Sequence, residues 1–232
     1  MILLSRRLLA LAEMIIKGGV TADIGADHGG LARFLVEHKM APQVIATELG
    51  DGPYQRLLAG VADSPCRGLI KIRRGDGLAV LGSGEAVNVV IAGLGGEAMA
   101  EILSADYSKA CSFKRFVFQP MSRAGALRRE LSGRGWPILE ERLIDENGRL
   151  FVALSAGPGD IPYRLTPLEI DVGPLLLRRE TAYRSRYLKS CLSRYRAACH
   201  GLMQAGGDRD IAVDEYRGKI LELEAKLDGS PG

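Results

Sequence analysis

The chain has 232 residues and a mass of 25.0 kDa, which is enough for one full hydrophobic core and a smaller additional unit. Its 47% hydrophobic and 25% charged residues are typical of a soluble globular protein, and Arg, Lys, Asp or Gly interrupts every apolar stretch before it could span a membrane. A formal net charge of +3 favours a polyanionic partner only mildly.

The residues that bind zinc or form disulfides are scattered and show no Cys-x-x-Cys pairing: Cys66, Cys111, Cys191, Cys199, His28, His38 and His200. This distribution supports neither a metal site nor a disulfide framework, so we expect no metal, reduced thiols and a cytoplasmic location. The N-terminus makes a poor signal peptide, because the basic pair Arg6-Arg7 follows the apolar residues and no sustained apolar stretch comes after it.

The first two thirds of the chain alternate short β-rich runs with helical patterns. The predicted strands are 20–24, 44–48, 69–73, 87–92, 116–119, 138–144 and 150–154, and the predicted helices include 31–37, 53–61, 97–103 and 124–131. Alternating strands and helices predict right-handed crossovers and an α/β fold with a doubly wound, mostly parallel seven-stranded sheet. The last two runs flank Asn147-Gly148, which predicts an antiparallel hairpin at the sheet edge.

The last third of the chain has a different pattern. Pro158, Pro162, Pro167 and Pro174 indicate a stiff connector over 158–174, between a first domain of 1–157 and a helical domain of 175–232. Two apolar stripes with heptad spacing then predict an antiparallel coiled-coil hairpin that turns at 204–208, and one long helix with a break is the alternative. The stripes are Leu188, Leu192, Tyr195, Cys199 and Leu202, and Val213, Tyr216, Ile220, Leu223 and Leu227.

The two predicted helical arms differ in charge. Residues 175–203 contain seven basic residues and one acid, and 208–228 contain seven acids and four bases. The basic arm suits a phosphate backbone, with Tyr183 and Tyr187 available for stacking. The alternatives are a solvated face or attraction between the arms. The candidate nucleic-acid contacts are Arg178, Arg179, Arg184 and Arg186.

The segment Ala22–Gly30 reads as a strand, a glycine-rich turn and the start of a helix, which places backbone amides and a positive helix end against a ligand. The Gly-x-Gly-x-x-Gly spacing of dinucleotide sites is absent. Carboxylates at Asp23 and Asp27 flank the turn and suit a ligand with a free ammonium group, such as S-adenosylmethionine. A tight turn that binds nothing is the alternative interpretation.

Further acids follow the next two predicted strands. In a doubly wound sheet the ligand lies at the carboxyl ends of the strands, so we expect Asp23, Glu48 and Asp76 to share one edge. Glu48 can accept both ribose hydroxyls, and Asp76-Gly77 can accept the adenine amine with the backbone close to the ring. Gly25, Gly93 and His28 complete the candidate S-adenosylmethionine site, and the alternatives for His28 are contact with the target base or the start of the helix.

These motifs, in this order, resemble the bacterial tRNA (adenine-22-N1)-methyltransferases, the TrmK family. The matching elements are 4–8, Asp23-Ile24-Gly25-Ala26-Asp27-His28, 52–54, 75–78, Gly93-Leu94-Gly95-Gly96, Gln119-Pro120 and 169–174. The resemblance implies a Rossmann-like class I methyltransferase domain, a C-terminal coiled coil that helps to hold tRNA, and methyl transfer to a D-arm adenine. It also implies that Arg7, Gly95 and Pro120 lie on the substrate side, and it implies no obligate protein partner.

Two positions depart from the family pattern: Ala26 replaces a Ser or Thr, and Met121 replaces the Asn of a Gln-Pro-Asn element. For catalysis the candidates are Asp27, His28 and Gln119. Asp27 would accept a hydrogen bond from the exocyclic amine of the target adenine; its alternative role is an acid at a helix N-terminus. Other functions remain open at this stage: methylation of another RNA base or a small molecule, or a cofactor-binding adaptor that has lost catalysis and recruits a protein.

Overall fold

The computed structural model describes residues 3–204 and 210–228, and the chain divides into two compact units, 1–164 and 165–232. The turn predicted at 204–208 lies almost wholly outside the described residues. The stretch predicted as a connector, 158–174, contains the helix α7 (Pro167–Val172). Thr166 caps α7, with its hydroxyl accepting from the Glu169 N–H while the Glu169 carboxylate accepts from the Thr166 N–H.

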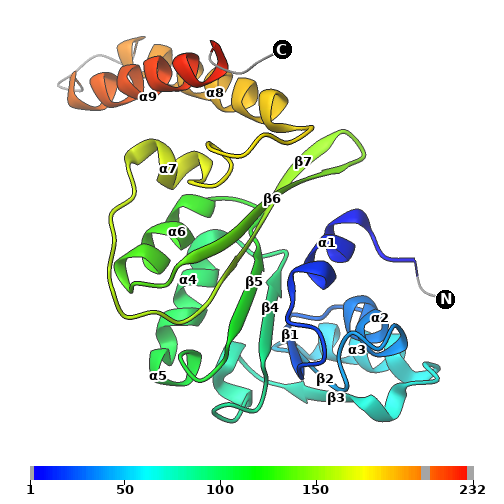
Figure 1. Ribbon diagram of the computed structural model, residues 1–232. Helices are drawn as coiled ribbons and strands as arrows, with labels where there is room; N and C mark the ends of the chain where they lie inside the picture. Colours follow the sequence, from blue (N-terminus) through cyan, green and yellow to red (C-terminus); the bar gives the residue numbers. More distant parts are fainter. Residues whose placement is uncertain (1–2, 205–209, 229–232) are drawn as a thin grey trace. The chain divides into compact units, whose positions relative to one another are not determined.

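The first unit is built around a seven-stranded sheet in the order β3-β2-β1-β4-β5-β7-β6, which confirms the predicted fold class (Figure 1). The strands are β1 (Thr21–Ile24), β2 (Val44–Glu48), β3 (Ile70–Arg74), β4 (Asn88–Ala92), β5 (Arg115–Gln119), β6 (Ile138–Glu146) and β7 (Arg149–Ala156). The first five are parallel, and β7 pairs antiparallel with both β5 and β6. The Asn-Gly hairpin therefore closes one edge, as predicted.

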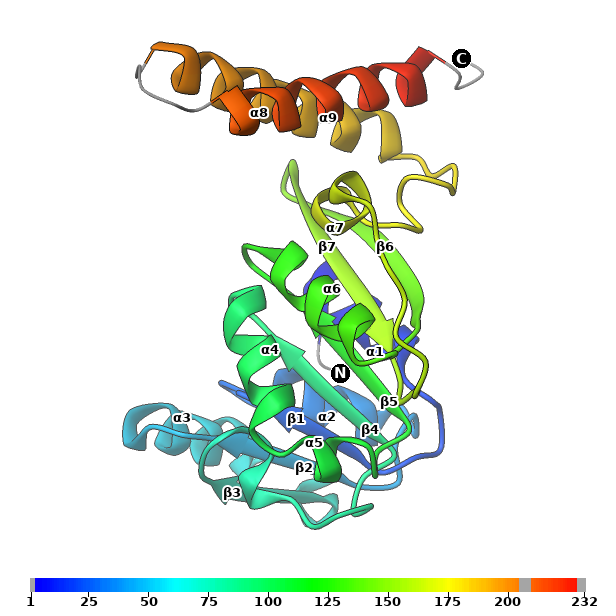
Figure 2. The same cartoon turned by 90° about the vertical axis from the view of Figure 1, so that its left-hand side faces the viewer.

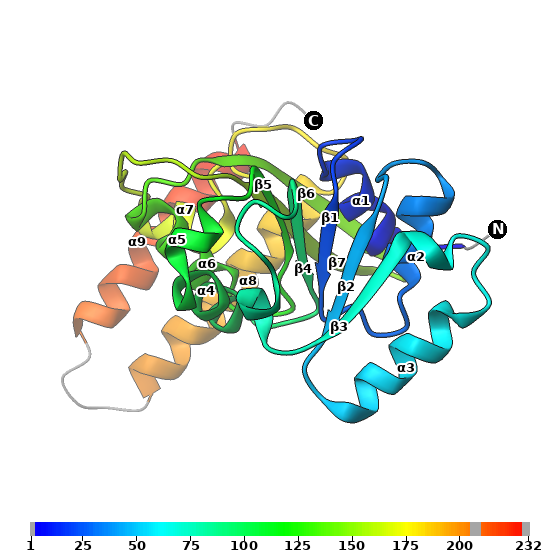
Figure 3. The ribbon, with the colours of Figure 1, turned by 90° about the horizontal axis from the view of Figure 1, so that it is seen from below.

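Helices cover both faces of this sheet (Figure 3). One core cluster joins α1 (Arg6–Met14), α2 (Gly30–Glu37) and α3 (Asp51–Ala62) to strand residues such as Val90 and Val117. The other joins α4 (Gly96–Ala105), α5 (Tyr107–Ala110) and α6 (Ala124–Gly133) to Phe116 and Phe118. Neighbouring residues of β5 point to opposite clusters, as the two-residue period of a strand requires. Short 3-10 turns, η1 (Arg67–Leu69) and η2 (Gly77–Val80), flank β3.

Helix α1 was not among the predicted elements. Ser5 caps it by accepting a hydrogen bond from the Leu8 N–H, and its apolar residues Leu8, Leu11, Ala12 and Ile15 follow the spacing of a helix face. The helix packs against β5, β6 and β7. It therefore adds side chains from the start of the chain to this end of the sheet.

The second unit contains α7 and two long helices, α8 (Arg184–Gln204) and α9 (Asp210–Asp228), which lie side by side (Figure 2). Leu188, Leu192, Tyr195 and Leu223 of the predicted stripes are buried in its core. The helical hairpin is thus confirmed, although α8 begins at Arg184 and leaves 175–183 as turns. No helix among the described residues is long and apolar enough to cross a membrane, and in the same part of the chain no group of His, Cys, Asp and Glu could hold a metal ion.

Candidate active site

A cleft of about 350 Å³ opens at the carboxyl ends of the strands, where the strand order reverses between β1 and β4. This is the place where doubly wound sheets bind ligands. Its wall draws on the end of β1 and the turn after it, on the end of β4, on β5 and on the start of α1. The residues include Asp23, Gly25, Asp27, His28, Gly93, Gln119, Ser5 and Arg7. Most of the predicted site residues of the first unit therefore meet in one cleft.

Asp23 has a buried carboxyl group in the wall of this cleft. The residue is 4% exposed, and its Oδ2 atom has no hydrogen-bond partner. Burial, together with the nearby Glu48 carboxylate, raises the pKa of Asp23 from its ordinary value of 3.8 to about 7. A buried acceptor without a donor is costly, and a cationic ligand in the cleft would supply the donor. The site therefore fits the ammonium group of an amino-acid-bearing nucleoside.

Hydrogen bonds to residues of β2 hold the turn after β1 in place. Gly25 has a φ of +74°, which glycine adopts without a steric penalty, and the Gly25 and Ala26 N–H groups both donate to the Thr47 carbonyl. The Asp27 N–H donates to Glu48 Oε1 at 2.6 Å. The N–H groups of residues 25 to 27 each have a protein acceptor, so these hydrogen bonds fix the shape of the turn around the cleft.

The side chains of Asp27 and His28 are both 65% exposed at the mouth of the cleft. The Asp27 carboxylate lies 3.6 Å from Arg56 Nε of α3 and 3.7 Å from His28 Nε2. Asp27 has a φ of +51°, so its backbone turns the side chain away from a regular helical start. Its carboxylate is thus available to a ligand that enters from solvent.

Asp76 and Gly77 line a neighbouring hollow of about 520 Å³, whose other wall includes Ala98 and Ile102 of α4. Asp76 follows β3 and its side chain is exposed. Glu48, at the end of β2, is partly buried on the strand between β1 and β3. The three acids therefore stand at one edge of the sheet in the predicted order, with Asp76 set apart from the cleft that contains Asp23.

The loops after β4 and β5 continue the pairing of their strands. The Gly93 N–H donates to Gln119, Met121 to Leu94, and Gly96 to Ser122, all between backbone atoms. A Cβ atom on Gly96 would lie 2.2 Å from the Arg123 carbonyl oxygen, so only glycine permits this approach. The pairing sets Gly95 against Ser122 and leaves the side chains of Leu94 and Met121 exposed.

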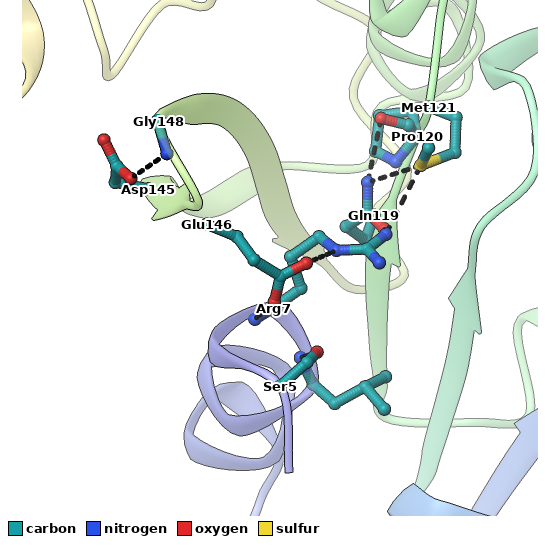
Figure 4. A network of polar contacts seen from close by, with 9 residues as sticks. Ser5, Arg7, Gln119, Pro120, Met121, Asp145, Glu146 and Gly148 are labelled. Atoms are coloured by element: carbon teal, nitrogen blue, oxygen red, sulfur yellow. Dashed lines mark hydrogen bonds and ion pairs between the residues drawn. The ribbon is translucent and has the colours of Figure 1, made fainter.

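Arg7 and Gln119 meet at the same end of the cleft (Figure 4). Arg7 Nη1 donates to Gln119 Oε1 at 3.3 Å and lies 3.5 Å from Met121 Sδ, and Gln119 Nε2 donates to the Pro120 carbonyl at 3.1 Å. Pro120 itself is buried, and its carbonyl accepts from the Gln119 amide. Met121 thus takes part in this network through its thioether sulfur.

The four arginines of the second unit that were predicted to bind RNA differ in their exposure and partners. Arg178 and Arg179 are exposed in the turns before α8, where Arg178 pairs with Glu169 at 2.7 Å, and Arg186 lies over the Tyr183 ring. Arg184, predicted as a nucleic-acid contact, is instead buried. It is 5% exposed, pairs with Glu180 and donates to the Leu177 carbonyl, so its guanidinium holds the start of α8 in place.

Sequence reasoning missed three residues beside the cleft: Ser5, Arg56 and Glu146. Ser5 lines the cleft, Arg56 faces Asp27, and Glu146 forms an ion pair with Arg7 at 2.6 Å. The Ser5 cap followed by helically spaced apolar residues could have indicated α1. Arg7 and Glu146 are separated by 139 positions in the sequence, so no local pattern joins them.

The sheet order and the cleft at its switch point define a Rossmann-like class I methyltransferase fold, and a family model described as "Methyltransferase domain" matches residues 4–154. More narrowly, the chain belongs to the tRNA (adenine(22)-N(1))-methyltransferase family. It is 35% identical over 183 residues to the Bacillus subtilis protein of that name, and the match covers 77% of each chain.

Solved structures agree over almost the whole chain. The crystal structure of the B. subtilis m1A22 tRNA methyltransferase TrmK has a TM-score of 0.87 at 29% identity, covering 98% of this chain and all of that one. Streptococcus pneumoniae Sp1610 in complex with S-adenosyl-L-methionine has a TM-score of 0.84 at 26% identity, covering 97% of this chain and all of that one. The likeness therefore includes the helical hairpin as well as the sheet.

Proposed function

We propose that this protein transfers a methyl group from S-adenosylmethionine to N1 of adenine 22 in the D-arm of tRNA. The observation that carries the proposal is the buried, unpartnered carboxyl of Asp23 in the cleft at the switch point. An amino-acid ammonium group would supply that atom with a donor and would also compensate the charge of the buried carboxylate. The family membership shown by the B. subtilis relative supplies the reaction and the nucleotide.

Three acids at the sheet edge would each bind a different group of the cofactor. Asp23 would accept from the ammonium group, Glu48 from the ribose hydroxyls and Asp76 from the adenine amine, with Gly25, Gly77 and Gly93 bringing the backbone close. Bound there, S-adenosylmethionine supplies an electrophilic methyl group on a sulfonium. The Glu48 carboxylate already accepts from the Asp27 N–H through Oε1. This hydrogen bond fixes the orientation of the carboxylate and leaves its other lone pairs for the ribose hydroxyls.

The protein's contribution to the reaction is placement and electrostatics. Adenine N1 carries an in-plane lone pair, so it attacks without prior deprotonation and the chain needs no general base. Holding the base in line for attack can supply several kcal/mol of the barrier. Asp27, exposed at the mouth of the cleft, would accept from the exocyclic amine and stabilise the positive charge that develops on the ring. His28 and Gln119 would border the same base.

The target nucleotide has to leave its stack to enter the cleft, which costs a few kcal/mol that other RNA contacts must offset. The exposed Arg178, Arg179 and Arg186 of the second unit, with Arg7, Gly95 and Pro120 of the first, are the proposed tRNA contacts. Phosphate contacts of this kind give affinity without sequence selection. A tRNA substrate also supports a cytoplasmic location for the protein.

Mass spectrometry of nucleosides tests the proposal directly. Purified protein, S-adenosylmethionine carrying a labelled methyl group and unmodified tRNA should yield labelled 1-methyladenosine, and a tRNA with guanine at position 22 should yield none. Label in another nucleoside would support a related methyltransferase with a different target. Binding of S-adenosylhomocysteine without label transfer would favour the cofactor-binding adaptor.

A further inference from the structure

Glu146 stands at the end of β6, beside the tip of the β6–β7 hairpin, and reaches the start of α1 (Figure 4). Asn147 and Gly148 form the tip with positive φ angles of +54° and +80°, and Asp145 Oδ1 accepts from the Gly148 N–H at 3.0 Å. This geometry is that of a two-residue hairpin turn, so the register of the two strands fixes where Glu146 lies.

The Glu146 carboxylate uses both of its oxygens on Arg7. Oε2 accepts from Arg7 Nε at 2.6 Å and Oε1 from the Arg7 backbone N–H at 3.3 Å, and the side chains are only 17% and 29% exposed. Hydrogen bonds from Arg7 and Ser5 hold the pKa of Glu146 below its ordinary value although burial acts in the opposite direction. The Arg7 guanidinium also lies over the Phe151 ring at 4.6 Å. Glu146 and Phe151 therefore both hold the Arg7 guanidinium in position.

Arg7 in turn decides which way the Gln119 amide faces. A guanidinium only donates, so the Gln119 atom opposite Arg7 Nη1 at 3.3 Å must be the carbonyl oxygen. The amide nitrogen then faces the Pro120 carbonyl and the Met121 sulfur. Arg7 and Gln119 both line the cleft that contains Asp23. The Pro120 carbonyl accepts only from the amide nitrogen, so it favours the same orientation, and without the guanidinium the Gln119 carbonyl oxygen would lose its charged donor and the amide would be held at one end only.

We propose that Glu146 is a positioning residue for methyl transfer: it holds the Arg7 guanidinium against the Gln119 amide and so fixes the hydrogen-bonding groups that Gln119 presents to the cleft. The inference rests on the proposed function, because it assigns Gln119 to the target-base side of that site. It adds to the active site a residue that touches neither cofactor nor base.

The variant Glu146→Gln keeps the size of the side chain and removes its charge. Small misplacements of a group beside the reacting atoms cost large factors in rate, so we expect the single-turnover rate at saturating tRNA and cofactor to fall at least tenfold. The affinity for S-adenosylhomocysteine, measured by calorimetry, should change by less than threefold. Arg7→Lys keeps the charge but replaces the two guanidinium nitrogens that contact Glu146 and Gln119 with a single ammonium nitrogen, and it should show the same pattern.

Glu13→Gln is the matched control. Glu13 Oε2 accepts from Arg142 Nη1 at 2.7 Å, so this pair also ties α1 to β6, but neither residue lines the cleft. If Glu146 only docks α1, the two variants should lose rate and thermal stability alike. If Glu146 acts through Gln119, only Glu146→Gln should lose rate, and in a Gln119→Ala background it should cause less than a twofold further loss.

A measurement that does not depend on catalysis tests this inference separately from the proposed function. The Gln119 side-chain amide signals in a nitrogen–proton correlation spectrum, identified by their loss in Gln119→Ala, should move in Glu146→Gln and stay in place in Glu13→Gln. Signals that do not move, or a Glu146→Gln rate equal to that of the wild type, would overturn the inference. A wild-type protein that methylates no tRNA would overturn the proposed function while the spectrum still tested the Gln119 contact.

Discussion

The Glu48 carboxylate accepts a hydrogen bond from the Asp27 N–H at 2.6 Å and so ties the end of β2 to the turn after β1. The same carboxylate raises the pKa of the buried Asp23 on the adjacent strand. Glu48 therefore shapes the turn and sets the electrostatics of the cleft, in addition to its proposed contact with the ribose.

Asp23→Asn is expected to stabilise the protein at alkaline pH while it weakens cofactor binding. The folded-state pKa of Asp23 is about 7 against an ordinary value of 3.8, so the folded chain holds this proton more tightly than the unfolded chain. Stability is therefore lost as pH rises from about 4 to 7, by an amount on the order of 2–4 kcal/mol. Asparagine has no proton to lose. Urea unfolding at pH 5 and pH 8 measures the difference, and equal pH dependence in both proteins would contradict it.

Glu48→Ala and Asp76→Ala should each weaken S-adenosylhomocysteine binding. Each substitution deletes a hydrogen bond to a charged acceptor, worth about 1.5–3 kcal/mol or roughly 10-fold to 150-fold in affinity. Calorimetry gives the affinities. Asp63→Ala, at the end of α3 and exposed, is the control and should bind as the wild type does. Since Glu48 also holds the Asp27 N–H, Glu48→Gln should lose less than Glu48→Ala.

Asp27→Asn should lower the methylation rate more than it lowers cofactor affinity. The carboxylate is exposed at the cleft mouth beside Arg56, and its proposed partner is the target base. Single-turnover rates at saturating cofactor separate the two effects. Asp51→Asn, which breaks the surface pair with Arg74 at the start of α3, should leave the rate unchanged. A variant with a normal rate and poor cofactor affinity would assign Asp27 to the cofactor instead.

Reversal of charge at Arg178, Arg179 and Arg186 should weaken tRNA binding and flatten its dependence on salt, because fewer counterions are released. Arg184 is left unchanged, since its buried guanidinium supports the fold of the second unit. Binding is measured at several salt concentrations. Arg217→Glu with Lys226→Glu on α9 is the control, and an equal loss of affinity for each reversed charge would mean that only the net charge matters.

A fragment of residues 1–164 should fold and bind S-adenosylhomocysteine, since the sheet, both of its core clusters and the cleft lie within it. It should bind tRNA more weakly than the full chain, because it lacks the basic arm. Calorimetry and a filter-binding assay test the two halves of this prediction. Undiminished tRNA affinity with the same salt slope would favour a protein partner for the helical unit.

Local patterns predicted most of the sheet. Strand β2 has the predicted bounds because a buried apolar run ends at an acid, and the Asn-Gly pair placed the β6–β7 hairpin. Helix α1 was not predicted, because its nine residues are too few to show a clear helical period in an apolar N-terminal segment. Arg184 lies four residues before Leu188, on the apolar face of α8, so its burial could have been predicted from spacing alone.

Side-chain contacts between distant parts of the chain leave no local pattern in the sequence from which they could be predicted. The order of acids at the strand ends predicted Asp23, Glu48 and Asp76 at one edge, because parallel strands end on the same side. The pairing of Arg7 with Glu146 depends on how α1 crosses the sheet toward the hairpin, and only the packed structure brings the two together.

The backbone hydrogen bonds between 93–96 and 119–122 limit where the cleft can widen. The loops after β4 and β5 share three interstrand hydrogen bonds and a contact at Gly96 that admits no side chain, so they form one rigid wall. Amide hydrogens in this wall should exchange with solvent slowly and together. Widening of the cleft to admit a nucleotide then has to come from its other lining segments, the turn after β1 and the start of α1, and Arg7 of α1 is held only by side-chain contacts with Glu146, Gln119 and Phe151.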